Sequence, residues 1–280
     1  MLLARDAKVA RGSKFERVPG RVACSDPRND TLELRTRDVF VVGDDRQAIF
    51  AFAGADSGSL DRLKAAYGAT ELPLNTTYRC AQSIVREAQR FVPDFEAGPD
   101  NPEGSVETIA QDELTAAAGP GDFILSRVNA PLVSVAMGLL RAGKRTKIAG
   151  RDIGKGLTTL TRKMRATSVP DFLRKVDGWK VREVQRLEAK FRGKCEVPAF
   201  QQRLDGILDQ AEMLCSLADG ARNVDEVVAR IEALFTDDGL GDKGLILCSS
   251  VHKAKGREAD RVFILRDTLR PGMSIEEDNI

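Results

Sequence analysis

The chain is poor in the residues that build several common kinds of functional site. It has one histidine, His252, so a multi-histidine metal centre is excluded and a Ser-His-Asp triad would have to use that residue. Its five cysteines are scattered and contain no C-x-x-C pair, which argues against a disulfide framework or a zinc knuckle. No apolar run approaches the ~20 residues of a membrane span, and the first residues lack the apolar middle of a signal peptide. We therefore expect a cytoplasmic protein with no membrane partner.

The composition is that of a folded chain, with 42% hydrophobic and 30% charged residues. The net charge is only +1, but the charges are segregated. Nine basic residues face a single acid, Asp152, in one stretch: Arg141, Lys144, Arg145, Lys147, Arg151, Lys155, Arg162, Lys163 and Arg165. Such a stretch is either a surface that neutralises phosphates or an ordinary solvated face. Charge reversal of Lys144, Arg145 and Lys147 should lower the salt dependence of DNA binding in the first case.

Apolar patterning predicts an α/β fold with a parallel sheet. Short β-branched or aliphatic runs at 39–42, 123–125, 147–149, 245–248 and 262–265 are typical of strands buried on both faces. Helical periodicity predicts helices at 59–67 with Ser59 as N-cap, at 80–92, and from Asn129 to a stop at Gly143. Three longer helices, 172–191, 200–217 and 224–235, form a block without an expected strand. Strands on both sides of this block indicate an α/β domain with a helical insertion.

Three segments carry residues suited to phosphate and base contacts. The run VFVVGDDRQAIFAFAGA at 39–55 places polar residues after a predicted strand, where parallel sheets bind ligands. In LPLNTTYRC at 72–80, an aromatic beside an arginine suits a base and a phosphate. LILCSSVHKAKGREADRVFIL at 245–265 has a basic, glycine-containing connection between two strands. Taken singly, the first segment is better explained as a surface turn and the second as a core tyrosine beside a surface arginine, and the third is also explained as a basic loop.

Together these segments resemble the motor core of superfamily 1 DNA helicases of the UvrD/Rep group. GDDRQAIFAFAGA resembles motif III, LNTTYRC motif IV and SSVHKAKGREADRVFIL motif V, in the family order. FILSRVNAPLVSVAMGLLRAGKRTKIAG resembles the stretch between motifs IV and V. The resemblance implies a RecA-like P-loop NTPase fold divided as follows: 1–38 unmatched, 39–70 a remnant of the first motor domain, 71–165 with 241–280 the second motor domain, and 166–240 a reduced 2B-like insertion.

The resemblance also assigns residues to the nucleotide. Gln47 matches the glutamine that senses the γ-phosphate, and Arg79 matches the arginine that contacts it; these two are the catalytic candidates. Tyr78 matches the aromatic that packs on adenine. Gly256 and Glu258 match the turn and the nucleotide-side acid of motif V. The implied cofactors are ATP and Mg²⁺.

A second set of residues matches positions that contact single-stranded DNA. Phe52 stands where relatives often carry a base-stacking tryptophan, although Ala53 replaces a frequent arginine. Arg127 and Asn129 fall at strand-contacting positions, and Asn129 is explained equally well as a helix cap. His252 and Lys255 match DNA-contacting positions of motif V. The implied partners are single-stranded DNA and duplex junctions, besides other repair or replication proteins.

Several family motifs have no match here. A phosphate-binding loop G-x-x-x-x-G-K-[ST] is absent, since GLLRAGKR at 138–145 ends in arginine and follows a predicted helix. No magnesium-binding acidic pair precedes motif III, and only a lead-in to motif VI is seen at 275–280. We therefore expect part of a 3′ to 5′ ATP-dependent DNA helicase whose chain alone does not hydrolyse ATP. The alternative is a non-catalytic module that binds single-stranded DNA or a partner helicase; a truncated product without activity is the third possibility.

Overall fold

The structure is a computed structural model that describes residues 21–22, 32–33, 41–44, 58–192, 197–236 and 244–269. The chain divides into two compact units, 1–108 with 271–280, and 109–270, and each is described by itself. Within the described ranges, no helix has the length and apolar character needed to cross a membrane.

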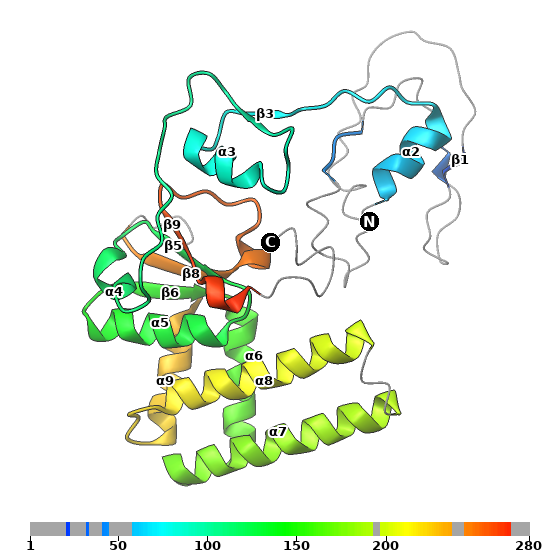
Figure 1. The fold of residues 1–280 in the computed structure, drawn as a ribbon. Helices are drawn as coiled ribbons and strands as arrows, with labels where there is room; N and C mark the ends of the chain where they lie inside the picture. Colours follow the sequence, from blue (N-terminus) through cyan, green and yellow to red (C-terminus); the bar gives the residue numbers. More distant parts are fainter. Residues whose placement is uncertain are drawn as a thin grey trace. The chain divides into compact units, whose positions relative to one another are not determined.

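The unit 109–270 is built on a parallel sheet of five strands (Figure 1). The strands are β5 (Phe123–Ser126), β6 (Thr146–Ala149), β7 (Phe235–Thr236), β8 (Ile246–Ser250) and β9 (Val262–Ile264), in the order β7-β6-β8-β5-β9. All four pairings are parallel, and β8 is buried along its whole length. The predicted parallel sheet is thus confirmed for this unit, except that β7 lies in a block where we expected no strand.

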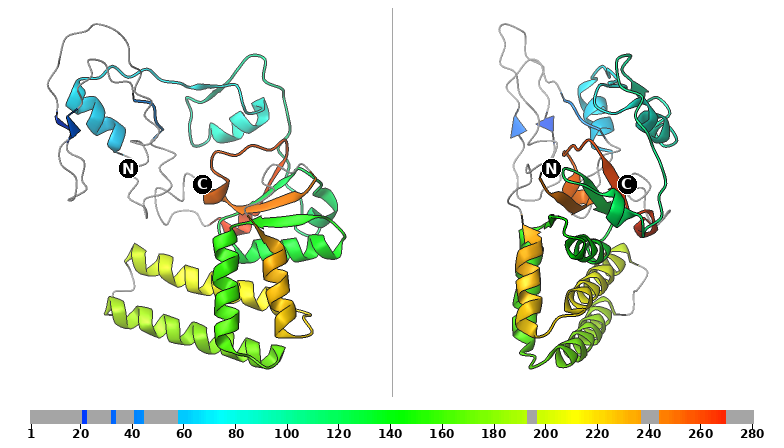
Figure 2. Two further views of the ribbon diagram at one scale, coloured as in Figure 1. Left: turned by 180° about the vertical axis from the view of Figure 1, so that it is seen from behind. Right: turned by 90° about the vertical axis from the view of Figure 1, so that its left-hand side faces the viewer.

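Helices cover this sheet and extend away from it. They are α4 (Leu114–Ala117), α5 (Ala130–Arg141), α6 (Arg151–Met164), α7 (Val169–Phe191), α8 (Pro198–Ala218), α9 (Val224–Leu234) and α10 (Val251–Ala254), with a 3₁₀ turn at Arg266–Thr268. Helix α5 lies against β5 and β6, α8 packs on α5, and α7 packs on α8, so these helices form successive layers (Figures 1 and 2). One hydrophobic core runs through all of them, from Ile124 in β5 to Leu214 in α8 and Phe172 in α7.

Helix α6 was not expected from the sequence. Its buried side is made of small or polar residues besides Leu157: Gly154, Thr158 and Thr161. This side contacts α9 and β7, and a Cβ on Gly154 would lie 2.6 Å from the Cβ of Phe235. The close packing of α6 therefore depends on a missing side chain. The helix is still strongly amphipathic, with charged residues on its exposed side, so its helical periodicity was a signal that the sequence prediction missed.

Helix ends in this unit follow the capping rules. Ser168 accepts from Asp171 N at the start of α7, and Asn223 accepts from Glu226 N at the start of α9. Helix α5 has a proline in its first turn and is followed by Gly143 at φ +75°. The segment at 138–145 is thus a helix end, as the sequence predicts, and not a strand-to-helix phosphate loop.

The amino-terminal edge of the sheet is fixed by an ion pair. Arg261 donates from Nε and Nη2 to the two carboxylate oxygens of Asp122, at 3.0 and 2.6 Å. Asp122 is buried and also accepts from Gly119 N, and the guanidinium of Arg261 lies over the ring of Phe263. Bidentate pairs of this kind add directional specificity. The starts of β5 and β9 are therefore locked side by side.

The other unit holds shorter elements: β1 (Arg21–Val22) antiparallel to β2 (Leu32–Glu33), α2 (Ser59–Tyr67), β3 (Thr76–Thr77) parallel to β4 (Glu96–Ala97), and α3 (Gln82–Ala88). Gly58, not Ser59, occupies the N-cap of α2, and α3 is shorter than the helix predicted over 80–92.

The buried strand predicted at 39–42 is wrong where the structure describes it. Val41 and Val42 form no strand, and Val42 is 73% exposed. No described strand pairs with Val41 or Val42, so their backbone N–H and C=O groups do not form the inter-strand hydrogen bonds that a buried strand requires.

Candidate functional site

The candidate site is the carboxyl edge of the parallel sheet in the unit 109–270. Strands β5 and β8 pair in register, and the pairing ends at Ser126 opposite Ser250. The chain therefore leaves both strands at one place, which carries Arg127 and Asn129 from one strand and His252 from the other. Edges of this kind are where open parallel sheets bind ligands. The structure thus brings His252 to the same edge as Arg127 and Asn129, although it is more than a hundred residues from them in sequence, so three DNA-contacting candidates share this edge.

The turn after β5 is held by an acid that sequence reasoning missed. Asp209 of α8 accepts from Asn129 N at 3.0 Å, from Asn129 Nδ2 at 2.9 Å and from Ala130 N at 2.7 Å. Asn129 stands at the N-cap of α5, but its side chain does not cap the helix; the Asp209 carboxylate takes that role. On the other side, Arg127 N donates to Thr268 Oγ1 at 3.1 Å. The backbone of Arg127 and the backbone of Asn129 and Ala130 are thus each anchored by a residue distant in sequence. These hydrogen bonds fix the position of Arg127.

Lys253 brings a further cation to the edge. Gly150 follows β6 with φ +134°, and a Cβ on it would lie 2.6 Å from Lys253 Nζ. The ammonium group thus lies close to the backbone at the end of β6, and the positive φ of Gly150 is a conformation that favours glycine. Arg151 begins α6 at the next position. Lysine and arginine side chains at three neighbouring strand ends give this edge a positive character suited to phosphates.

The motif V candidates divide between this edge and the segment that follows it. Lys255 directly follows the short helix α10 and is exposed. Gly256 has φ +83° and forms the turn, with Arg257 N donating to Ala254 O. Because β9 is parallel to β5, the chain from Lys255 must return to the amino-terminal edge, where Arg261 pairs with Asp122. Glu258 lies on this return segment and not on the carboxyl edge itself.

Tyr78 and Arg79 lie in the other unit, on a turn held by hydrogen bonds. The buried Asn101 donates from Nδ2 to Thr77 O at 2.8 Å and to Cys80 O at 2.7 Å, on either side of the pair. The Tyr78 ring is 77% exposed, and a Cβ on Gly98 would lie 2.6 Å from its Cδ1. The alternative that Tyr78 is a core residue is therefore wrong. An exposed ring in a fixed turn is able to offer one face to a base.

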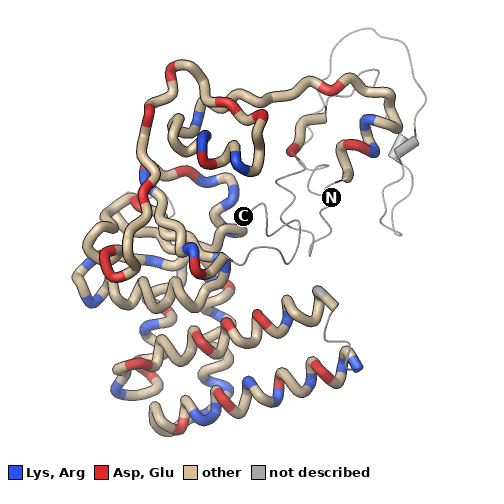
Figure 3. Tube along the Cα trace, in the orientation of Figure 1, with Lys and Arg blue, Asp and Glu red and all other residues tan. Residues whose placement is uncertain are grey.

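The basic stretch 141–165 is partly used within the fold. Lys144 donates to Ala118 O, and Lys147 to Ala233 O, where they satisfy backbone carbonyls. Arg141 pairs with Asp219 and Arg162 with Glu232, both at 3.2 Å. Mixed charges also alternate along α7 (Figure 3), where neighbouring acids and bases pair at Asp171–Lys175, Asp177–Lys180 and Glu183–Arg186. Much of the stretch is therefore an ordinary structural and solvated surface.

Two of the candidates, Gln47 and Phe52, lie outside the described residues. Asn101 and Asp209 had no sequence signal beyond their residue type, because each acts on backbone groups far away in the chain. Among the described residues, no three acidic, histidine or cysteine side chains gather as metal ligands.

No protein-family model and no curated protein with which we compared the chain matches it, so the helicase resemblance stays a prediction.

Proposed function

We propose that the chain is part of an ATP-dependent DNA translocase of the UvrD/Rep type and that its unit 109–270 is a RecA-like motor domain. The parallel sheet flanked by helices is compatible with this assignment. The order of the motif-like segments is the second support. In such a motor, single-stranded DNA passes over the carboxyl ends of the β-strands, and ATP binding changes the affinity of this edge for the DNA.

The observation that carries the proposal is the shared end of β5 and β8. Arg127 and His252 emerge from strands that stop in register, and Lys253 extends from the second to the end of β6. Basic side chains along one edge of the sheet suit the phosphates of an extended single strand. The backbone at Gly150 and the Lys253 ammonium group lie together at the end of β6, and Arg151 follows Gly150 in the chain.

For the nucleotide, only the local geometry of the Tyr78 turn supports the proposal. Asn101 fixes the turn, and the exposed ring of Tyr78 suits an adenine face, with Arg79 next to it for a phosphate. ATP with Mg²⁺ supplies the phosphoryl group whose transfer to water drives such motors. The part of this chain is to bind the base and to place one guanidinium; we assign no Mg²⁺ ligand.

The second candidate is a binding module that holds single-stranded DNA without responding to nucleotide. It is supported by the same sheet edge and needs no contribution from Tyr78 or Arg79. The two functions differ in coupling, because in a motor each ligand changes the affinity for the other.

The test measures the affinity for a labelled single-stranded oligonucleotide by anisotropy, with and without a non-hydrolysable ATP analogue. A translocase should show an affinity that changes with the analogue, and Arg79→Gln should abolish the change. Arg90→Gln, at an exposed arginine of the same unit that pairs with Glu87, is the matched control. An oligonucleotide affinity that does not change with the analogue would support the binding module. Absence of oligonucleotide binding would contradict both the translocase and the binding module.

Lys253→Gln tests the sheet edge separately. Loss of one phosphate contact should reduce the slope of log affinity against log salt by about 0.7 for a single strand. Lys190→Gln removes an equal charge from an exposed position of α7 and should leave the slope unchanged. Equal slopes for both variants would remove Lys253 from the DNA track.

A further inference from the structure

A groove between α6, α7 and α8 lies away from the sheet edge and is lined by an unusual set of side chains. Its volume is about 390 Å³, at the lower end of the range for small-molecule sites. Helix α6 forms one wall with residues on a single helical face, and α7 and α8 contribute one residue each. The lining comprises Lys155, Gly156, Leu160, Lys163, Trp179 and Gln210, besides the Thr159 hydroxyl.

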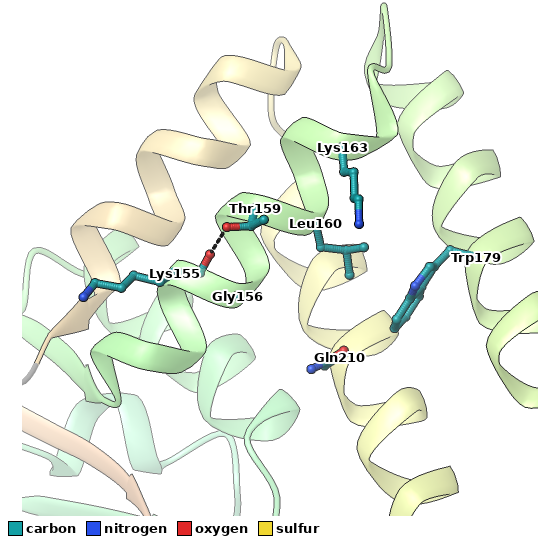
Figure 4. Close-up of a pocket in the computed structure, with 7 residues that line it drawn as sticks. All are labelled: Lys155, Gly156, Thr159, Leu160, Lys163, Trp179 and Gln210. Carbon is teal, nitrogen blue, oxygen red and sulfur yellow. Dashed lines mark hydrogen bonds between the residues drawn. The ribbon is translucent and has the colours of Figure 1, made fainter. Parts of the chain in front are cut away.

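Trp179 is the single tryptophan of the chain, and it stands at this groove. It is partly buried against the hydrophobic core, which holds the indole in place. Figure 4 shows the indole reaching from α7 toward Leu160 on α6, with Gln210 of α8 beside it. A fixed aromatic ring next to an aliphatic side chain is a platform for a flat base, and the Gln210 amide offers both a donor and an acceptor.

The charge of the groove is positive and uncompensated. No lining residue is acidic, and within the described part of the chain neither Lys155 nor Lys163 has a carboxylate partner. Lys163 lies on the same side as the indole, whereas the ammonium group of Lys155 points away from it (Figure 4). This contrasts with α7, whose lysines are paired at Asp171–Lys175 and Asp177–Lys180.

Gly156 leaves free space at the α6 wall of the groove. It lies in the interior of α6, where glycine destabilises a helix relative to alanine. Gly154, two residues earlier, is explained by its contact with Phe235, but a Cβ on Gly156 would meet nothing within 4 Å. No packing contact therefore requires glycine at 156, and any larger side chain there would project toward the groove that it lines.

We propose that this groove binds one nucleotide unit of a single-stranded nucleic acid, with the base on Trp179 and a phosphate at Lys163. Lys155 takes the next phosphate. The inference rests on the proposed function in that it gives the bound strand a second contact, on helices α6, α7 and α8, beyond the sheet edge. A lone aromatic with flanking cations matches a nucleotide better than it matches a peptide helix, which requires an extended apolar groove.

The test uses the fluorescence of Trp179, which no other residue of the chain shares. Titration with an oligothymidylate should quench this fluorescence with the same midpoint as the anisotropy of a labelled strand. Gly156→Leu, which fills the groove and favours the helix, should weaken strand binding by about 5- to 150-fold, the factor that corresponds to ~1–3 kcal/mol of base stacking. Gly206→Leu is the control, because Gly206 is also an exposed helix-interior glycine with free space around it, in α8.

Lys163→Gln should also lower the salt slope, whereas Lys190→Gln should not. Strand binding without a change in tryptophan fluorescence and unaltered by Gly156→Leu would overturn the groove and leave the sheet edge standing. Quenching by adenosine monophosphate as strong as that by the oligonucleotide would also overturn the proposal, because it would identify a free nucleotide as the ligand. Loss of the sheet-edge effect of Lys253→Gln, with quenching retained, would contradict the proposed function and not the groove.

Discussion

The two candidate surfaces of this protein are held by different forces. The carboxyl edge of the sheet rests on a continuous hydrophobic core that includes Ile124 of β5. The Tyr78 turn belongs to a region, 58–108, where Val85 is the one buried hydrophobic side chain among the described residues. There the position of the turn depends on hydrogen bonds from Asn101. Apolar burial fixes a surface together with the whole domain, whereas polar contacts fix it locally.

Ile124→Ala should give the largest loss of stability and test the first half of this contrast. Ile124 is 0% exposed, and removal of three buried carbon atoms from such a site costs about 2–5 kcal/mol. The measurement is the free energy of unfolding of the full chain in urea. Ile84→Ala, at a residue of α3 that is 46% exposed, should change it by less than about 0.5 kcal/mol. Similar losses in the two variants would contradict the difference between the regions.

Asp209→Ala should have the next largest effect, because it removes the acceptor that joins α8 to the start of α5. Three donors of Asn129 and Ala130 would lose their charged partner, which is worth about 1–3 kcal/mol. The free energy of unfolding and the strand affinity should fall together, since Arg127 is placed by the same turn. Asp205→Ala, one turn earlier on an exposed face of α8, should affect neither quantity. A stable Asp209→Ala protein with weakened binding would show that the turn is not part of the core.

These two variants also mark the limit of what the sequence predicts. The strands of the five-stranded sheet other than β7 were predictable because Ile124 and its neighbours form apolar runs, and the long helices because apolar residues recur along them at helical spacing. Helix α6 was missed although it is amphipathic, because glycine and threonine, and not aliphatic residues, occupy most of its buried side. Asp209 acts on a residue 80 positions earlier, and Asn101 on carbonyls 21 and 24 positions earlier. No local pattern contains such a pairing, because it depends on how distant elements pack.

Asn101→Ala should disturb the Tyr78 turn and leave the other unit unchanged. Loss of its amide leaves the carbonyl groups of Thr77 and Cys80 without this donor, which should ease local opening by about 1–2 kcal/mol. Tryptic cleavage after Arg79 should then become about 5- to 30-fold faster, since cleavage follows the population of the open form. The unfolding of the sheet, followed by Trp179 fluorescence, should stay the same.

Asn75→Ala provides the matched control in the same region, because that side chain makes no hydrogen bond that holds the Tyr78 turn. Its cleavage rate should equal that of the parent chain. Faster cleavage in both variants would mean that the turn is not fixed by Asn101 in particular.

The smallest effect is expected at Glu226, a half-buried polar contact at the surface of the hydrophobic unit. Its carboxylate accepts from Arg222 N at 3.0 Å, from Arg222 Nε and from Arg230, and these hydrogen bonds lower the pKa of Glu226 from 4.5 to about 2. Because the folded state binds this proton more weakly than the unfolded state, the contribution to stability is complete above pH 4.5. It is lost as the pH falls from there toward 2.

The melting temperature of the parent chain should therefore decline over this acid range more steeply than that of Glu226→Gln, which has no such carboxylate to protonate. Glu183→Gln, at a glutamate of α7 that pairs with Arg186, should follow the parent curve and serves as the control. High salt should narrow the difference, because exposed charges are screened. If the melting curves of Glu226→Gln and the parent run parallel from pH 4.5 to 2, the polar contacts of Glu226 add no stability to that of the hydrophobic core. The unit 109–270 would then depend on apolar burial alone, and its difference from the hydrogen-bonded region 58–108 would be larger than we expect.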